Sequence, residues 1–407
     1  MDSLGLVLRH LDTTRPWQEE LYRELHAHPE LSSHEELTSA EIARRLGAFG
    51  FAVQTVGGGV VGVLSNGAGP VVLHRADIDG LPVTETTGLP YASTDVAVDD
   101  SGATVGVMHA CGHDVHITAL LGAAALLSTE RGAWSGTFIA LFQPAEETAV
   151  GARAMVEAGL TDLVPRPDVA FGQHVLGHAA GVLGTQPGPV LSAGDSIRIT
   201  VFGTGSHGSM PHLGVDPVVL AAAIVMRLQT VVSREVAPGE LAVVTVGSIA
   251  AGTKSNVIPD RAVLLVNLRA YDAGVRRHVV DAVERIVRGE CEAAGSPQPP
   301  LFEYYDQFPL TDNDPEVTAR VTAAFADHFG PERVVPLGRI PASEDFSGIP
   351  DAFGTPYTYW GLGGFAPGSA APPNHSPSFA PVLQPTLDAG TAAIVVAAMA
   401  YLRKEMP

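Results

Sequence analysis

The chain has 407 residues, of which 46% are hydrophobic and 17% are charged, and its formal net charge is −20 at pH 7. This composition is typical of a well-buried globular protein and excludes an intrinsically disordered chain. The excess of negative charge argues against nucleic acids and anionic membranes as partners. The length is too great for one compact core, so we expect two domains.

The two cysteines, Cys111 and Cys291, lie far apart in the sequence. This spacing argues against a disulfide framework and fits a reducing, cytoplasmic location. Charged residues interrupt the N-terminal segment, so we predict no secretory signal there. The longest apolar stretch, residues 389–402, is shorter than the ~20 residues of a membrane span and predicts a buried C-terminal helix.

The first part of the chain alternates between helical and strand patterns. Residues 17–49 have helical periodicity, with Pro29 separating two helices. Apolar runs that suit strands then alternate with helical stretches, in the order 71–73, 117–127, 137–142, 152–158 and 169–171. This alternation predicts an α/β fold with a largely parallel sheet flanked by helices.

The pattern changes at about residue 192. Strand patterns at 196–201, 241–249, 262–270 and 301–305 are interleaved with helical patterns at 216–232 and 274–294. The order βαββαβ is the ferredoxin-like arrangement. We therefore predict that residues 1–191 and 309–407 form one domain and that residues 192–308 are inserted into it. The small residues and prolines at 361–373 predict a loop. This loop is a candidate wall or flap of a substrate pocket.

The run His109-Ala110-Cys111-Gly112-His113-Asp114-Val115-His116 gathers a thiol, three imidazoles and a carboxylate. Soft sulfur, borderline nitrogen and hard oxygen together suit zinc or a neighbouring divalent metal. Gly112 permits a turn tight enough for both flanking side chains to reach one site. A structural role for the cluster on its own is about equally well supported.

Three further patches carry metal-competent side chains. Glu146 and Glu147 follow an apolar run, at the carboxyl end of a predicted strand where open α/β sheets place their ligands. His174 closes another apolar run, and His375 lies near the C-terminus. Each alone is more often a surface carboxylate or a polar core residue. Their occurrence together favours a metal site.

These motifs resemble those of the co-catalytic metallo-aminoacylase and carboxypeptidase family. The resemblance is strongest to its branch of hippurate hydrolases, N-acyl-amino-acid amidohydrolases and plant auxin-conjugate hydrolases. It rests on strings along nearly the whole chain: LHAHPEL at 25–31, RADIDGLP at 75–82, HACGHDVH at 109–116, QPAEE at 143–147, SNVIPD at 255–260, SEDF at 343–346 and NHSP at 374–377. It implies an α/β catalytic domain with an inserted ferredoxin-like domain that serves as lid and dimerisation domain.

The resemblance also implies roles for single residues. The metal ligands would be Cys111, His113, Glu147, His174 and His375. The cysteine thiolate would bridge two divalent ions, with zinc the first choice and manganese, cobalt or nickel also compatible. Glu146 would be the general base. Asp77, Asp114 and His116 would lie next to the ligands, where carboxylates orient metal-binding imidazoles.

A second group of residues is implied in the inserted domain. His207 would donate to the oxyanion of the transition state from the partner subunit of a homodimer. Ser206 stands before it where the family usually has glycine. Asn256 and Arg269 would bind the substrate carboxylate, a role that suits the planar guanidinium.

We therefore expect a zinc-type metallo-amidohydrolase that cleaves N-acyl-L-amino acids into a carboxylic acid and an amino acid. Residues 233–236 and the following strand suggest the aminoacylase subgroup that acts on N-acyl-glutamine. The alternatives are a dipeptidase or an N-acyl-diaminopimelate deacetylase on the same scaffold. A metal-bound binding protein without catalysis is a third, although it would have no reason to keep Glu146 beside a ligand.

Overall fold

The computed structural model describes residues 2–99 and 101–404, which fall into two compact units. The first unit contains the residues up to Val190, Asp312–Arg339 and the residues from Asp345 on. The second contains Leu191–Thr311 and Ile340–Glu344. The range 192–308, predicted as an insertion, lies inside the second unit.

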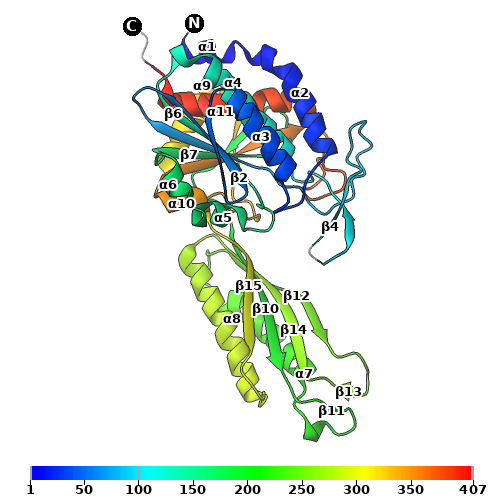
Figure 1. Cartoon of the computed structure of the whole chain (residues 1–407). Coiled ribbons are helices and arrows are strands. Elements are labelled where there is room, and N and C mark those ends of the chain that lie inside the picture. Colours follow the sequence, from blue (N-terminus) through cyan, green and yellow to red (C-terminus); the bar gives the residue numbers. More distant parts are fainter. Residues whose placement is uncertain (1, 100, 405–407) are drawn as a thin grey trace. The chain divides into compact units, whose positions relative to one another are not determined.

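A mixed eight-stranded sheet forms the centre of the first unit (Figure 1). Its order is β1 (Ala52–Val56), β2 (Gly59–Asn66), β6 (Gly136–Gln143), β3 (Val71–Asp77), β7 (Val169–Ala179), β18 (Tyr357–Phe365), β8 (Leu183–Thr185) and β17 (Val334–Pro336). The adjacent strands β6, β3, β7 and β18 are parallel. The predicted α/β fold with a mostly parallel sheet is confirmed. The carboxyl ends of these strands meet at one edge, where such sheets bind ligands.

Helices cover both faces of this sheet, as a buried parallel sheet requires. On one face α4 (His113–Thr129) and α11 (Leu383–Leu402) pack together and against β3 and β6. On the same side lie α1 (Ser3–Leu8), α2 (Leu11–Ala27), α3 (Glu36–Ala48) and α9 (Pro315–Phe329). The short helices α5 (Gly151–Glu157), α6 (Leu160–Leu163) and α10 (Gly348–Phe353) lie on the other side in Figure 1.

Two helices in the described part of the chain are long and apolar enough to cross a membrane by length and composition alone. They are Pro217–Glu235 and Leu383–Leu402. Of the apolar 18-residue stretch in the second helix, 78% is buried inside the protein. This agrees with the C-terminal core helix predicted from the sequence. The first belongs to the second unit, and only 33% of its apolar stretch is buried.

The prediction of a loop at residues 361–373 is wrong for its first five residues. Gly361 to Phe365 belong to β18, and every residue of that strand is buried. The glycine content that suggested a loop serves packing instead. A Cβ on Gly363 would lie 2.0 Å from the carbonyl oxygen of Ala179, so only glycine allows the two backbones to approach. The hairpin of β1 and β2 was also not predicted.

The second unit contains a four-stranded antiparallel sheet with the order β12 (Ala242–Ala251), β14 (Arg261–Ala270), β10 (Ala193–Phe202) and β15 (Leu301–Phe308). The helices α7 (Pro217–Thr230) and α8 (Ala273–Ala293) share a hydrophobic core with β10 and β14. Asp216 and Asp272 cap their first turns with side-chain hydrogen bonds. With its βαββαβ order, this unit has the predicted ferredoxin-like topology.

The remaining strands and turns are short. In the second unit, β11 (Ser206–His207) pairs with β13 (Val257–Ile258), and a π-helical turn, Val231–Glu235, extends α7. The strands β4 (Val96–Val98) and β5 (Thr104–Gly106) form a small hairpin, and β9 (Gly188–Leu191) pairs with β16 (Thr311–Asn313). The 3-10 turns are Arg131–Ala133, Pro211–Leu213 and Pro331–Arg333.

A buried ion cluster joins α2 to the first turn of α4. His26 Nδ1 lies 2.7 Å from Asp114 Oδ2, and His26 Nε2 lies 3.1 Å from Glu85 Oε1. Burial alone would lower the pKa of His26, but the hydrogen bonds to both carboxylates outweigh it and raise the pKa to about 10. One imidazolium therefore neutralises part of the charge of two buried carboxylates.

Replacement of this imidazolium should be costly. We expect His26→Ala to lower the free energy of unfolding by about 3 kcal/mol at pH 6, because two buried carboxylates lose their cation. The pKa is higher in the folded state, so the stabilisation is complete below about pH 6.5 and is lost as the pH rises through about 10. Urea unfolding at pH 6 and pH 9.5 measures both effects.

The matched control is His28→Ala, because His28 forms an exposed pair with Asp95. It should change the free energy of unfolding by less than about 1 kcal/mol. Equal effects of the two substitutions would contradict the role given to the buried cluster.

Candidate functional site

The site begins at a sharp turn where the chain enters α4. Gly112 caps the helix with a φ of 79°, and Cys111 and His113 flank it. A Cβ on Gly112 would lie 2.3 Å from Cγ1 of Val175. Glycine is therefore needed both for the left-handed backbone and for the close approach to β7. The turn directs the thiol and the imidazole to the same side, as the sequence predicted.

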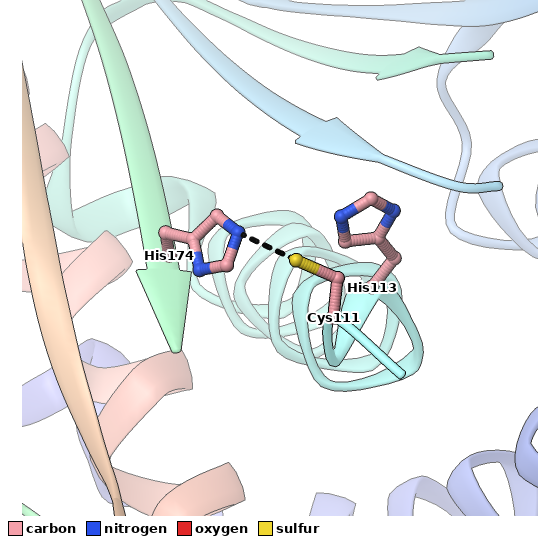
Figure 2. A group of neighbouring side chains, drawn as sticks. All are labelled: Cys111, His113 and His174. Atoms are coloured by element: carbon pink, nitrogen blue, oxygen red, sulfur yellow. Dashed lines mark hydrogen bonds between the residues drawn. The ribbon is translucent and has the colours of Figure 1, made fainter. Parts of the chain in front are cut away.

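Two groups of side chains meet at the Cys111 thiol. In the first, the candidate ligand atoms of Cys111, His113 and His174 all lie within 4.8 Å of one another (Figure 2). In the second, the same holds for Cys111, Glu147 and His375. The structure thus brings together the five predicted ligands, from three separate segments of the sheet edge and from the C-terminal loop. The sulfur is the atom that the two groups share.

Hydrogen bonds orient the two imidazoles of the first group. His174 Nδ1 donates to the carbonyl oxygen of Val175 at 2.8 Å, so its Nε2 lone pair faces Cys111 Sγ at 3.5 Å. Burial lowers the pKa of His174 well below its usual value, which keeps this lone pair available. His113 Nδ1 contacts the carbonyl oxygen of Asp79 at 2.9 Å, and its Nε2 has no hydrogen-bond partner among the described residues.

The residues fit a metal ion. His113 Nε2 is a buried polar atom without a hydrogen bond to any described residue, and such an atom is costly unless a ligand satisfies it. Glu147 Oε1 lies 3.3 Å from His375 Nε2. Thiolate, imidazole and carboxylate are the donors that zinc prefers. The thiol of Cys111 and the carboxylate of Glu147 raise the pKa of His375 to about 10. A metal ion must displace this proton, so the metal affinity should increase with pH.

The carboxylates Glu146 and Glu147 follow β6 on a tight loop. The Glu147 amide donates to Asp79 Oδ2 at 3.0 Å. Glu146 is buried. One of its carboxylate oxygens lies within 4.8 Å of a ring nitrogen of His113 and of a carboxylate oxygen of Glu147. The carboxylate predicted as general base is therefore beside the group of ligands.

His116 has no nitrogen left for a metal ion. Its Nδ1 lies 2.5 Å from Asp77 Oδ1, and its Nε2 accepts from the Val175 amide at 2.8 Å. Asp77 also accepts from Arg75 at 2.7 Å. Both residues therefore lie beside the candidate ligands, as predicted from the sequence.

The prediction that Asp114 orients a ligand histidine is wrong. Its carboxylate contacts His26 instead, because residues 113 and 114 are adjacent on α4 and point in different directions. Asp79 takes this role, since its Oδ1 lies 3.1 Å from His113 Nδ1 and its Oδ2 also accepts from Ser32. Asp79 was not predicted from the sequence, although it lies in the RADIDGLP string at 75–82.

The other predicted residues lie in the second unit. His207, on β11, is exposed, and its Nδ1 accepts from the Ser209 amide at 3.1 Å. The proton of the neutral ring is therefore on Nε2, which can donate to a ligand. Asn256 lies opposite, because its carbonyl oxygen accepts from the Gly208 amide at 2.9 Å. His207 and Asn256 thus lie close together at the pair of strands β11 and β13.

Arg269 lies near the C-terminal end of β14, in the four-stranded sheet. It is half-buried, its Nη1 donates to Ser343 Oγ at 2.5 Å, and its Nε donates to Asn267. Burial lowers its pKa. Within the described residues it forms no ion pair with a carboxylate. This guanidinium is therefore suited to an anionic ligand.

The length of strand β14 separates His207 and Asn256 from Arg269. β11, which carries His207, pairs with β13, and β13 precedes β14, whose first residue is Arg261. Arg269 lies eight residues further along β14. At roughly 3.3 Å per residue the two ends are about 25 Å apart. A single small substrate cannot contact His207 and Arg269 of the same chain.

The fold and the ligand group together define a class: an α/β protein with a mixed thiolate, imidazole and carboxylate site at the carboxyl edge of its parallel strands. Comparison with protein families makes this specific. The model of the family described as "Peptidase family M20/M25/M40" matches residues 73–400 of this chain. The chain belongs to this family, and the resemblance predicted from its motifs is confirmed.

Individual relatives agree with this assignment. The chain is 34% identical over 386 residues to thermostable carboxypeptidase 2 of Saccharolobus solfataricus, with 93% of this chain and 94% of that protein covered. It is 39% identical over 287 residues to an N-acyl-L-amino acid amidohydrolase of Geobacillus stearothermophilus, with 69% and 74% covered. A solved Bacillus subtilis structure, described as a dinuclear metal-binding peptidase of the M20 family, has a TM-score of 0.77 and 29% identity, with 95% and 98% covered.

The shared position of Cys111 in both groups leads to a prediction. Cys111→Ser should lower the bound metal from about two ions per chain to about one or fewer, because a hydroxyl is a poorer bridging ligand than a thiolate. Elemental analysis after dialysis against a metal-buffered solution measures this. Cys291→Ser is the matched control, since Cys291 is buried in the second unit, and it should keep the full content. An unchanged stoichiometry in Cys111→Ser would exclude a bridging thiolate.

Proposed function

We propose that this protein is a metallo-amidohydrolase that cleaves N-acyl-L-amino acids into a carboxylic acid and a free amino acid. The observation that carries the proposal is the Cys111 thiol shared between two groups of candidate ligands, with the Glu146 carboxylate beside them. Two divalent ions, zinc first, would be held by Cys111, His113, Glu147, His174 and His375. Zinc suits the mixed donor set, although manganese, cobalt and nickel accept the same ligands.

The chemistry follows from the weakness of an amide as an electrophile. When bound, the ions polarise the substrate carbonyl and lower the pKa of water, to about 7 in favourable sites. Glu146 takes the proton from the attacking water and later delivers it to the leaving amine. His207 Nε2 donates to the oxygen that becomes negatively charged in the transition state.

The substrate class follows from the carboxylate that two kinds of substrate share. An N-acyl-amino acid and the C-terminal end of a peptide both carry a free carboxylate on the carbon next to the amide nitrogen. Arg269 can bind such a group with two parallel hydrogen bonds, and Asn256 can add a further one. The net charge of −20 gives anionic substrates no long-range attraction, so these local groups must supply the binding energy.

A peptide substrate is the second candidate. It is favoured by the relative named carboxypeptidase, which is matched over more of this chain than the relative named amidohydrolase. The two functions differ only in what lies on the acyl side of the amide. A simple acyl group favours the first and an aminoacyl group the second.

We further propose that the protein acts as a homodimer and that the second unit serves as its dimerisation domain. The separation of His207 from Arg269 within one chain supports this, because both are expected at one substrate. A site could then take Arg269 from its own chain and His207 with Asn256 from the partner.

The first test is metal-dependent turnover. The protein should release free amino acid from at least one of N-acetyl, N-benzoyl and long-chain N-acyl derivatives of glycine, glutamine and leucine, and chelation should abolish the release. Dipeptides in the same panel identify the second candidate function. Glu146→Gln should lower kcat about 10²- to 10⁴-fold at unchanged metal content, because only the base is lost.

Glu147→Gln is the matched control for this test. It changes the adjacent carboxylate in the same way, but it should lose metal together with activity, because Glu147 is a ligand. Near-normal turnover of Glu146→Gln would remove Glu146 from the role of base.

Mixed dimers test the exchange of residues between subunits. Neither His207→Ala nor Glu146→Gln should be active alone, but mixed dimers should regain about a quarter to a half of the wild-type activity, since one intact site forms. Arg269→Ala mixed with Glu146→Gln should regain none, because both groups belong to the same chain's site. Absence of recovery in verified His207→Ala mixed dimers would place His207 in its own subunit's site or outside catalysis.

A further inference from the structure

The loop that carries Glu146 has an unusual backbone. Ala145 and Ala149 have φ values of 48° and 56°, in the left-handed region that residues with a Cβ rarely adopt. The carbonyl oxygen of Ala145 accepts from the amides of Val150 and Gly151, which closes the loop on itself. Such a conformation typically costs ~1 kcal/mol or more per residue and persists only where the surroundings hold it.

Two carboxylates hold this loop, one on each side of Glu146. Asp79 Oδ2 accepts from the Glu147 amide at 3.0 Å. Glu35 Oε1 accepts from the Ala145 amide at 2.8 Å. Because the amides before and after Glu146 are both fixed, the direction of the Glu146 side chain depends on both contacts.

Glu35 belongs to a segment that faces the site edge at several points. Glu35 is only 5% exposed. The carbonyl oxygen of Glu30 accepts from the Gly80 amide at 2.7 Å, and Ser32 Oγ donates to Asp79 Oδ2 at 2.7 Å. The segment is therefore anchored beside both carboxylates, and Glu35 can act as a fixed support.

An empty space lies beside the hydrogen bond from the Ala145 amide to Glu35. This space makes the hydrogen bond important for the position of the loop. A cavity of about 170 Å³ is lined by Glu35, Gly58 and Ala145, among others. No side chain fills it, so the loop has room to move if the hydrogen bond from the Ala145 amide is lost. A loop packed tightly on all sides would keep its position without this bond.

We propose that Glu35 is a positioning residue for the general base: it accepts the Ala145 amide and so fixes the loop that aims the Glu146 carboxylate at the reacting water. The inference rests on the proposed function for the role of Glu146. Glu35 itself takes no part in the chemistry, since its contact is with the backbone of the loop.

The hydrogen bond does not depend on the charge of Glu35. Burial and the negative charge of Asp79 raise the pKa of Glu35 to about 7. A protonated carboxyl keeps a carbonyl oxygen that accepts a hydrogen bond, and so does a carboxamide. Glutamine should therefore replace Glu35 in this role, whereas alanine cannot.

The experiment compares three variants in the full-length, metal-loaded protein. Glu35→Ala should lower kcat about 10- to 100-fold with little change in KM or in bound metal, because the base is misplaced while substrate and ligands remain bound. Glu35→Gln should stay within about threefold of the wild-type kcat. Asp168→Ala is the control, since Asp168 accepts a backbone amide, that of Val71, at 2.8 Å elsewhere in the same unit. It should keep the wild-type kcat.

A second measurement is independent of turnover. Hydrogen exchange of the amides of residues 145–147 should be faster in Glu35→Ala and unchanged in Glu35→Gln and Asp168→Ala. Glu35→Asp, which withdraws the acceptor by one methylene, should show a smaller change of the same kind and replaces Glu35→Ala if that variant does not fold.

Three results would overturn the inference. They are a wild-type kcat and exchange in Glu35→Ala, an equal loss in Glu35→Gln, and an equal loss in Asp168→Ala, which would indicate a general effect on stability. If the wild-type protein cleaves no substrate, the proposed function fails. Unchanged exchange at residues 145–147 in Glu35→Ala would instead reject the role of Glu35, whatever the substrate.

Discussion

The candidate site depends first on the side chain of Asp79. One of its oxygens contacts the His113 imidazole, and the other accepts from the Glu147 amide. It thus fixes a ligand from the first turn of a helix and the loop after a neighbouring strand with a single rigid group. Because these two segments are far apart in sequence, no local interaction could keep them in register. A carboxylate that accepts several hydrogen bonds is held firmly itself, and Ser32 contributes to holding it.

The sequence predicted which candidate ligands the fold brings together, because each motif carries its chemistry in adjacent residues. Cys111 and His113 are brought together by the turn between them, and Glu146 follows a strand pattern that ends at a known place in the sheet. The residues that orient the ligands were predicted less well. Asp114 was predicted to orient a ligand histidine and contacts His26 instead, while Asp79 and Glu35 accept from backbone amides that are distant in the chain. Such partners depend on tertiary structure, which spacing alone does not encode.

The same division applies to the fold. Strands and helices with clear periodicity, such as β10, α7 and α8, were predicted within a few residues of their bounds. β18 and the hairpin of β1 and β2 were not, since glycines stand where strand patterns have large residues. At Gly363 that glycine is required by the close approach of a neighbouring backbone. Composition therefore suggested a loop at a place where two backbones pack closely together.

The start of α4 has a further consequence for the charge of the site. The amino end of a helix carries partial positive charge and attracts anions, yet here the helix begins at a candidate cation ligand, His113. Acidic side chains reverse this preference: Asp114 accepts from the Val115 amide of the first turn, and Asp77 and Asp79 lie against the neighbouring imidazoles. A preference of this helix end for cations must therefore come from the surrounding carboxylates rather than from its backbone. Neutralising these acids would leave the partial positive charge of the helix end unopposed.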